Sequence, residues 1–175
     1  MSHAAAGIPV AAIAPRWLPA YVGLGSNLSD PAAQVRRAFE ALAQLPGARL
    51  LARSSLYRTR PFGAVVQPAF VNAVAGLLTQ RTPEELLAQL RALERELGRT
   101  AADERWGPRL IDLDLLVCGR EMRATQTLTL PHPGIAERDF VLYPLAEVAP
   151  DLVVPGRGRV AELLLRAENR GVERL

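Results

Sequence analysis

The sequence contains no lysine, and its 21 basic residues are all arginine. The chain therefore has no lysine to form a Schiff base, to bind phosphate in a P-loop or to contact nucleotide in a protein-kinase site. If the protein binds phosphate groups, arginine side chains or metal ions must contact them. This single absence excludes several classes of nucleotide-binding protein.

Cysteine and histidine are almost absent too. Cys118 is the single cysteine, which excludes an internal disulfide and fits a reducing compartment. It ends an apolar run, so we expect a buried thiol. His3 lies near the first residue and His132 is the one histidine in the body of the chain, so a zinc site of cysteine and histidine ligands is not expected.

Long apolar runs are missing, although 49% of the residues are hydrophobic. No run is long enough to span a membrane. Residues 1–17 are rich in alanine, but they lack the basic start of a signal peptide and contain prolines. We expect residues 1–17 to be a disordered leader, residues 18–175 to be a single domain, and the protein to be cytoplasmic and monomeric.

Hydrophobic periodicity predicts the order of strands and helices. Short apolar or alternating runs predict four strands, over residues 20–25, 49–59, 69–78 and 110–118. Two helices are predicted to begin after Asp30 and Thr82, because each of these capping residues precedes a proline. The order strand, helix, strand, strand, helix, strand is the split βαβ pattern of a ferredoxin-like sheet. We expect an α+β fold with a mostly antiparallel sheet, both long helices on one face and short helices over 139–149 and 160–170 on the other.

Two aspartates interrupt the last predicted strand, which is otherwise apolar. Residues i and i+2 of a strand point to the same face, so Asp112 and Asp114 should lie side by side. Two carboxylates on one half-buried face repel each other and lose hydration unless a cation neutralises them. The pair has two interpretations: a site for a hard divalent ion such as Mg²⁺, or two solvated aspartates beside the basic loop that contains Arg105 and Arg109.

The segment around these aspartates resembles the signature of a known enzyme family. Residues 105–114 have the sequence RWGPRLIDLD, which is similar to the R-W-G-P-R-x-x-D-L-D signature of the 6-hydroxymethyl-7,8-dihydropterin pyrophosphokinases of folate biosynthesis. The resemblance extends from about residue 20 to about residue 165 and includes GLGSNL at residues 23–28 and YRT at residues 57–59. It implies a single catalytic domain that transfers pyrophosphate from ATP to 6-hydroxymethyl-7,8-dihydropterin and releases AMP.

The resemblance also implies roles for individual residues. Asp112 and Asp114 would bind two Mg²⁺ ions, and together with Arg99 and Arg109 they would form the catalytic set. The residues implied in ATP binding are Glu94, Arg99, Arg105, Arg109, His132 and Arg138. Those implied in pterin binding are Thr59, Phe70, Asn72, Trp106 and Phe140, with the two phenylalanine rings on opposite faces of the pterin.

Several of these residues have a simpler structural interpretation that the sequence leaves open. Glu94 could be a solvated carboxylate on a helix, and His132 could belong only to a turn fixed by the prolines beside it. Phe70 could pack in the core. The chain also departs from the family, because Ala101 and Ala102 occupy loop positions that often carry basic residues.

An RNA-binding module is the alternative from another functional class. The pI of about 9.7 and a ferredoxin-like sheet are also typical of RRM domains. However, the alternating aromatic residues of the RNP1 pattern are missing, and Asp112 and Asp114 would repel phosphate groups unless a metal were bound. We therefore expect ATP and the pterin as partners, and neither nucleic acid nor a membrane.

Overall fold

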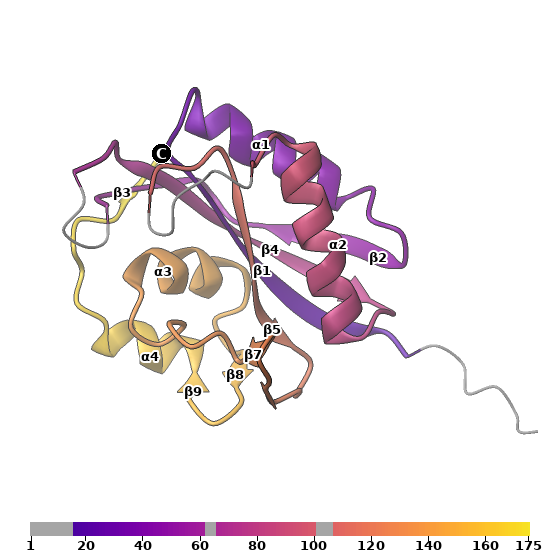
Figure 1. Ribbon diagram of the computed structural model, residues 1–175. Helices are drawn as coiled ribbons and strands as arrows, with labels where there is room; N and C mark the ends of the chain where they lie inside the picture. Colours follow the sequence, from indigo (N-terminus) through magenta and orange to yellow (C-terminus); the bar gives the residue numbers. More distant parts are fainter. Residues whose placement is uncertain (1–15, 62–65, 101–106) are drawn as a thin grey trace, which may run out of the picture.

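An antiparallel sheet forms the centre of the computed structural model, which describes residues 16–61, 66–100 and 107–175 (Figure 1). Its strands follow the order β10-β3-β4-β1-β5, and β2 pairs with the other half of β4. The bounds are β1 (Leu18–Ser26), β2 (Ala48–Arg53), β3 (Tyr57–Thr59), β4 (Phe70–Thr79), β5 (Asp112–Cys118) and β10 (Glu173–Arg174). The predicted α+β fold with an antiparallel sheet is confirmed, since β4 lies between β1 and the β2–β3 edge as the split βαβ pattern requires.

Two long helices, α1 (Pro31–Leu42) and α2 (Pro83–Glu96), cover one face of the sheet (Figure 1). Asp30 begins α1 by accepting a hydrogen bond from the amide of Ala33, and Thr82 forms a complete capping box with Glu85 at the start of α2. The apolar stripes of the helices pack on the sheet, where Leu42, Leu86, Leu90 and Leu113 are buried together. This face therefore contains the larger part of the core.

The other face is covered by α3 (Asp139–Val148) and α4 (Val160–Arg166) (Figure 1). Leu142 and Leu145 of α3 pack with Val160 of α4 against Val74 and Leu116 of the sheet. Two small hairpins flank these helices, one of β6 (Arg123–Ala124) with β7 (Thr129–Leu130) and one of β8 (Val153–Val154) with β9 (Gly158–Arg159). The prediction of helices on both faces is confirmed.

The strand predicted over residues 49–59 is wrong in one respect, because it is interrupted after Arg53. The side chain of Ser54 replaces part of the ladder, since its hydroxyl accepts a hydrogen bond from the amide of Val74 at 2.9 Å. Glu147 of α3 then accepts hydrogen bonds from the amide of Ser55 and the hydroxyl of Tyr57, both at 2.9 Å. Polar side chains thus satisfy the backbone at the break, which the alternating pattern could not reveal.

Other expectations concern the thiol and the ends of the chain. Cys118 is fully buried, and burial raises the pKa of its thiol to about 11, so it stays protonated at neutral pH. Within residues 16–61, 66–100 and 107–175, no helix is both long and apolar enough to cross a membrane. The predicted leader falls almost entirely on residues 1–15, which lie outside the described residues.

We predict that Glu147→Gln destabilises the protein by about 1–3 kcal/mol at neutral pH, because the carboxylate accepts hydrogen bonds at the strand break. Burial alone would raise the pKa of Glu147, but hydrogen bonds from Ser55 and Tyr57 and the charge of Arg174 outweigh it and lower the pKa below its usual 4.5. A group with a depressed native pKa stabilises the fold above its unfolded pKa, and this contribution is lost as pH falls through the native pKa. Urea unfolding should therefore give a difference between wild type and variant that shrinks in acid.

Glu162→Gln, on the exposed side of α4, is the matched control and should change the free energy of unfolding little at either pH. An unchanged stability of Glu147→Gln at neutral pH would contradict the stabilising role of this carboxylate.

Candidate active site

Two adjoining cavities meet at the aspartates of β5. The first lies between the sheet and α3, and its lining includes Gly23, Gly25, Thr59, Phe70, Asn72 and Phe140. The second lies beside the end of α2, and its lining includes Arg91, Glu94, Arg99 and His132. Four residues line both cavities: Arg109, Asp112, Asp114 and Arg138. The charged residues are therefore concentrated where the two spaces join.

Asp112 and Asp114 lie on one face of β5, as predicted, while Leu113 between them is buried under α2. Each aspartate stands opposite a glycine of the neighbouring strand β1, with Gly25 paired to Asp112 and Gly23 paired to Asp114. Both glycines line the first cavity, and a Cβ there would approach Leu116 at Gly23 and Asn72 at Gly25. The glycines of the GLG segment thus contribute directly to the shape of the site.

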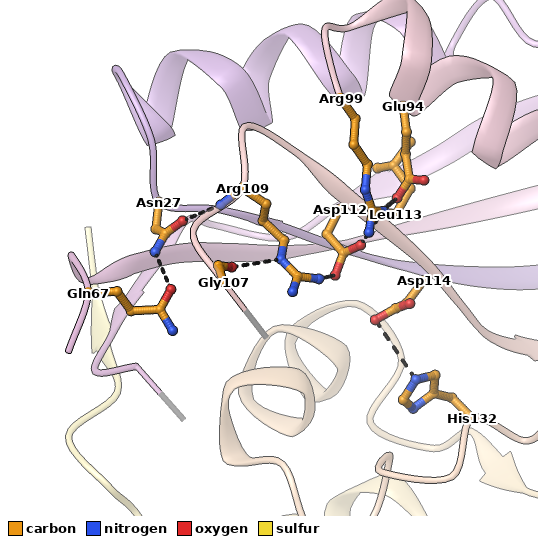
Figure 2. Close-up of polar contacts among 10 residues, drawn as sticks. All are labelled: Asn27, Gln67, Glu94, Arg99, Gly107, Arg109, Asp112, Leu113, Asp114 and His132. Atoms are coloured by element: carbon orange, nitrogen blue, oxygen red, sulfur yellow. Dashed lines mark hydrogen bonds and ion pairs between the residues drawn. The ribbon is translucent and has the colours of Figure 1, made fainter. Parts of the chain in front are cut away.

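The carboxylate of Asp112 contacts two arginines. Its Oδ1 lies 2.6 Å from Nη1 of Arg99, and its Oδ2 lies 2.6 Å from Nη1 of Arg109 (Figure 2). The side chain is 22% exposed, so the interpretation of Asp112 as a solvated aspartate is wrong. Asp114 is 44% exposed, and loss of hydration and then the negative charge of Asp112 raise the pKa of Asp114.

Glu94 holds Arg99 in this position. It is only 6% exposed, and its Oε1 accepts hydrogen bonds from Arg99 Nη1 at 2.5 Å and from the amide of Leu113 at 2.7 Å (Figure 2). The solvated interpretation of Glu94 is therefore wrong as well. Burial is the main reason that the pKa of Glu94 is raised, and the charge of Asp112 adds to it. Gly98, with φ of 106°, allows the chain to turn from α2 toward Arg99.

His132 points toward Asp114 across the second cavity (Figure 2). The amide of Gly134 donates to Nδ1 at 3.2 Å, so the neutral ring carries its proton on Nε2, which lies 3.8 Å from Asp114 Oδ2. Burial, followed by the positive charge of Arg138, lowers the pKa of His132 to about 4. A neutral histidine therefore presents an N–H donor to the cavity, which goes beyond its place in a proline-containing turn.

The described residues that are expected to bind the pterin all line the first cavity. Asn72 donates to Thr59 Oγ1 at 2.7 Å, and this links β4 to β3. A Cβ on Gly25 would lie 3.0 Å from Asn72 Oδ1, so a side chain there would crowd this amide. Phe70 and Phe140 come from opposite walls, β4 and α3. Phe70 is partly exposed and lines the cavity, so the interpretation of simple core packing is wrong.

Asn27 is a positioning residue whose contacts the sequence analysis did not predict. It is 2% exposed, its Oδ1 accepts from the amide of Arg109 at 2.8 Å, and its Nδ2 donates to Gln67 and to the carbonyl of Pro68 (Figure 2). It thereby connects the end of β1 to the chain segments that precede β4 and β5. The only sequence signal for Asn27 is its place directly after residues 23–26, GLGS. Arg60 and Gln67 also line the first cavity, and no sequence pattern marks them as site residues.

Five residues named in the sequence analysis lie outside the described residues: His3, Ala101, Ala102, Arg105 and Trp106. Of the residues predicted to bind ATP or the pterin, the described ones all line one of the two cavities.

The oxygen ligands of Asp112 and Asp114 suit a hard divalent cation. In the described part of the chain, no set of three or more histidine, cysteine, aspartate or glutamate side chains is arranged to hold a metal ion. Mg²⁺ does not need such a set, because it keeps several waters and commonly binds one or two carboxylates together with substrate phosphates. The raised pKa of Asp114 points the same way, since a nearby cation would relieve the repulsion between the two carboxylates.

Comparison with known proteins gives a consistent result. Residues 21–150 match the family model described as 7,8-dihydro-6-hydroxymethylpterin-pyrophosphokinase (HPPK). The 2-amino-4-hydroxy-6-hydroxymethyldihydropteridine pyrophosphokinase of Pseudomonas aeruginosa is 47% identical over 155 residues, which cover 89% of this chain and 95% of the relative. The enzyme of the same description from Haemophilus influenzae is 42% identical over 147 residues, 84% of this chain and 91% of the relative.

The fold is also similar to solved structures. The wild-type HPPK-DHPS protein of Plasmodium falciparum, solved with pteroate, superposes with a TM-score of 0.69 at 12% identity. The match covers 89% of this chain and 43% of that chain, so this chain spans less than half of the solved protein. At this identity the likeness supports the fold alone.

We predict that Arg138→Ala raises the pKa of His132 from about 4 toward its ordinary 6.5, because the variant removes a positive charge that opposes protonation of the ring. Burial of the ring remains, so the shift should be partial. The measurement is an NMR titration of the imidazole in a His3→Gln background, which leaves His132 as the single histidine.

Arg91→Ala is the matched control, since it removes another arginine from the second cavity that is not among the charges shifting His132. A wild-type titration midpoint near 6.5, or equal shifts in both variants, would contradict the electrostatic description of this ring.

Proposed function

We propose a mechanism for this chain, which belongs to the 7,8-dihydro-6-hydroxymethylpterin-pyrophosphokinase family. The enzyme transfers pyrophosphate from ATP to 6-hydroxymethyl-7,8-dihydropterin in folate biosynthesis. The hydroxymethyl oxygen loses its proton and bonds to the β-phosphorus, the bond from that phosphorus to the oxygen bridging the α-phosphate breaks, and AMP leaves. One observation carries the proposal: an aromatic cavity and an arginine-rich cavity meet at Asp112 and Asp114.

The first part of the proposal concerns the two aspartates, which would hold Mg²⁺ together with the phosphates of ATP. Bound Mg²⁺ supplies positive charge that neutralises phosphate oxygens and acts as a Lewis acid at the transferred group. The protein's contribution is to fix the ligands in advance. β5 is paired along its length to β1, so the separation of Asp112 and Asp114 is set by the sheet rather than by a loop.

The second part concerns the positive groups around the phosphates. Arg99 and Arg109 both contact Asp112, so their guanidinium groups already lie at the junction of the two cavities. Arg138 lines both cavities as well. Guanidinium groups suit phosphate oxygens because they donate two parallel hydrogen bonds. Neutral His132 would add one uncharged donor, its Nε2–H, on the side of the nucleotide.

The third part concerns the pterin, which would occupy the first cavity. Phe70 and Phe140 come from facing walls, as a flat heterocycle stacked on both faces requires. Asn72 and Thr59 lie on adjacent strands and supply polar groups for the edge of the ring. In this arrangement the hydroxymethyl group would point toward the junction, where the phosphates are held.

The remaining parts of the proposal concern the whole molecule. Residues 18–175 would form the catalytic domain, acting as a monomer with ATP and the pterin as its ligands. A cytoplasmic location fits the single cysteine, since a buried free thiol persists in a reducing compartment.

We predict that Asp114→Asn suppresses turnover strongly while the fold survives, because the variant removes one charged ligand from the proposed Mg²⁺ site. Loss of a group that stabilises the transferred phosphate costs about 100-fold or more in kcat. The measurement is a coupled assay of AMP release at saturating Mg²⁺, with and without the pterin alcohol. Circular dichroism checks the fold.

Asp151→Asn is the matched control, because Asp151 is an exposed aspartate that pairs with Arg159 and lines neither cavity. Near-wild-type AMP release by Asp114→Asn would show that the metal assignment is mistaken.

We predict that Phe140→Ala weakens pterin binding by about 1–3 kcal/mol, taking aromatic stacking on nucleic-acid bases as the guide. ATP affinity should barely change, because the ring lines the first cavity and not the second. Calorimetry with the pterin and with an ATP analogue measures both. Leu165→Ala, at an exposed position of α4, is the control, and equal losses for both ligands would indicate a folding defect instead of lost stacking.

A further inference from the structure

The C-terminal segment, residues 169–175, contacts both walls of the first cavity from outside. One wall consists of β3 and β4, with Thr59, Phe70 and Asn72, and the other is the start of α3, with Phe140. The segment runs from the end of α4 to the outer edge of β3 (Figure 1). It lies beyond residues 21–150, the range of the family model.

The contact with α3 is made through the buried carboxylate of Asp139. This side chain is 3% exposed, its Oδ1 accepts from the amide of Phe140, and its Oδ2 accepts from the amide of Arg170, both at 2.8 Å. A carboxylate at the first turn of a helix is also stabilised by the helix dipole. One carboxylate thus joins the C-terminal segment to the peptide of the aromatic residue that faces the pterin.

The contact with β3 is made by β10. Glu173 and Arg174 pair antiparallel with Arg58 and Tyr57, and the amide of Leu175 donates to the carbonyl of Leu56 at 2.8 Å. The strand β3 in turn pairs with β4 on its other side, from Tyr57 opposite Asn72 to Thr59 opposite Phe70. The position of β10 is therefore tied to the wall that contains the other aromatic residue of the cavity.

The residues between these two contacts form a fixed turn. Oδ1 of Asn169 accepts hydrogen bonds from the amides of Gly171 at 2.9 Å and Val172 at 3.1 Å. Gly171 has φ of 92°, a conformation that glycine adopts without strain. The connection between the walls is short and hydrogen-bonded, so a displacement at one end is passed to the other.

We propose that Asp139, acting through the amide of Arg170, is a positioning residue that sets the distance between the two pterin-binding walls. This inference rests on the function proposed above. Phe140 follows Asp139 directly, so release of the carboxylate changes where the ring stands relative to Phe70. Two of the groups assigned to ATP, Glu94 and Arg99, lie at the end of α2, whereas a third, Arg138, directly precedes Asp139. The segment therefore affects pterin affinity much more than ATP affinity.

The test uses the full chain and removes one hydrogen-bond donor. Arg170→Pro lacks the amide N–H that donates a hydrogen bond to Asp139, whereas Arg170→Ala keeps this donor and loses only the side chain. Arg170→Pro should raise the Kd for 6-hydroxymethyl-7,8-dihydropterin about 10-fold in calorimetry, since small displacements of positioning groups can cost up to about 100-fold. Arg170→Ala should bind the pterin like wild type, and in Arg170→Pro the Kd for an ATP analogue should rise much less than the Kd for the pterin.

A second variant changes the acceptor of the same hydrogen bond. Asp139→Asn offers a single acceptor oxygen to two amides, so it should also raise the Kd for the pterin, and it serves if Arg170→Pro does not fold. Hydrogen exchange at residues 170–175 should increase in both variants.

The outcomes separate this inference from the proposed function. No AMP release by wild type would contradict the proposed function. An active wild type whose two variants show faster exchange at residues 170–175 but native pterin affinity would overturn the positioning role alone. Equal losses of pterin and ATP affinity would also overturn it, because they indicate a general loss of structure.

Discussion

The ion pairs of Asp112 are the interaction on which the rest of the site depends. Without a cation, two neighbouring carboxylates in a partly buried cleft would lose hydration and repel each other. Arg99 and Arg109 offset both costs, and they approach from opposite ends of the segment between α2 and β5. The same ion pairs determine where the two guanidinium groups lie. They therefore neutralise the aspartate and also position the groups that would bind phosphate.

This arrangement explains why Glu94 is buried at the end of α2. Nη1 of Arg99 donates to the carboxylates of both Glu94 and Asp112. The amide of Leu113 donates to the same Glu94 oxygen that Arg99 contacts. The strand, the helix end and the arginine are thereby joined at a single oxygen. Removing the negative charge of Glu94 would leave Arg99 held by Asp112 alone, and any ligand that competes for Asp112 would then release it. Burial of a carboxylate is costly, and here it has a positional purpose.

The sequence predicted the elements of the fold well because their signals are local. The caps at Asp30 and Thr82 and the alternation around Asp112 depend on neighbouring residues only, and all three are found in the structure. The break after Arg53 was missed because it is stabilised by Glu147, which is 92 residues away from Ser55. Likewise, the partners of Asn27 lie 40 residues or more along the chain, so no local pattern could identify its contacts.

The two cavities also differ in how they are held, and this difference has a consequence for the enzyme. The aspartates rest on β5 and β1, whose pairing is continuous with the core, so the geometry of phosphate chemistry is as stable as the sheet. One aromatic wall is the start of β4, at Phe70, where β4 pairs with β3, a strand of three residues. The other is the start of α3, at Phe140, so both aromatic residues lie near the ends of their elements, at the periphery of that core. Peripheral elements open at lower free energy than core strands. A cavity formed by them needs external contacts to keep its width, and Asp139 and β10 supply such contacts on the outer side of both walls.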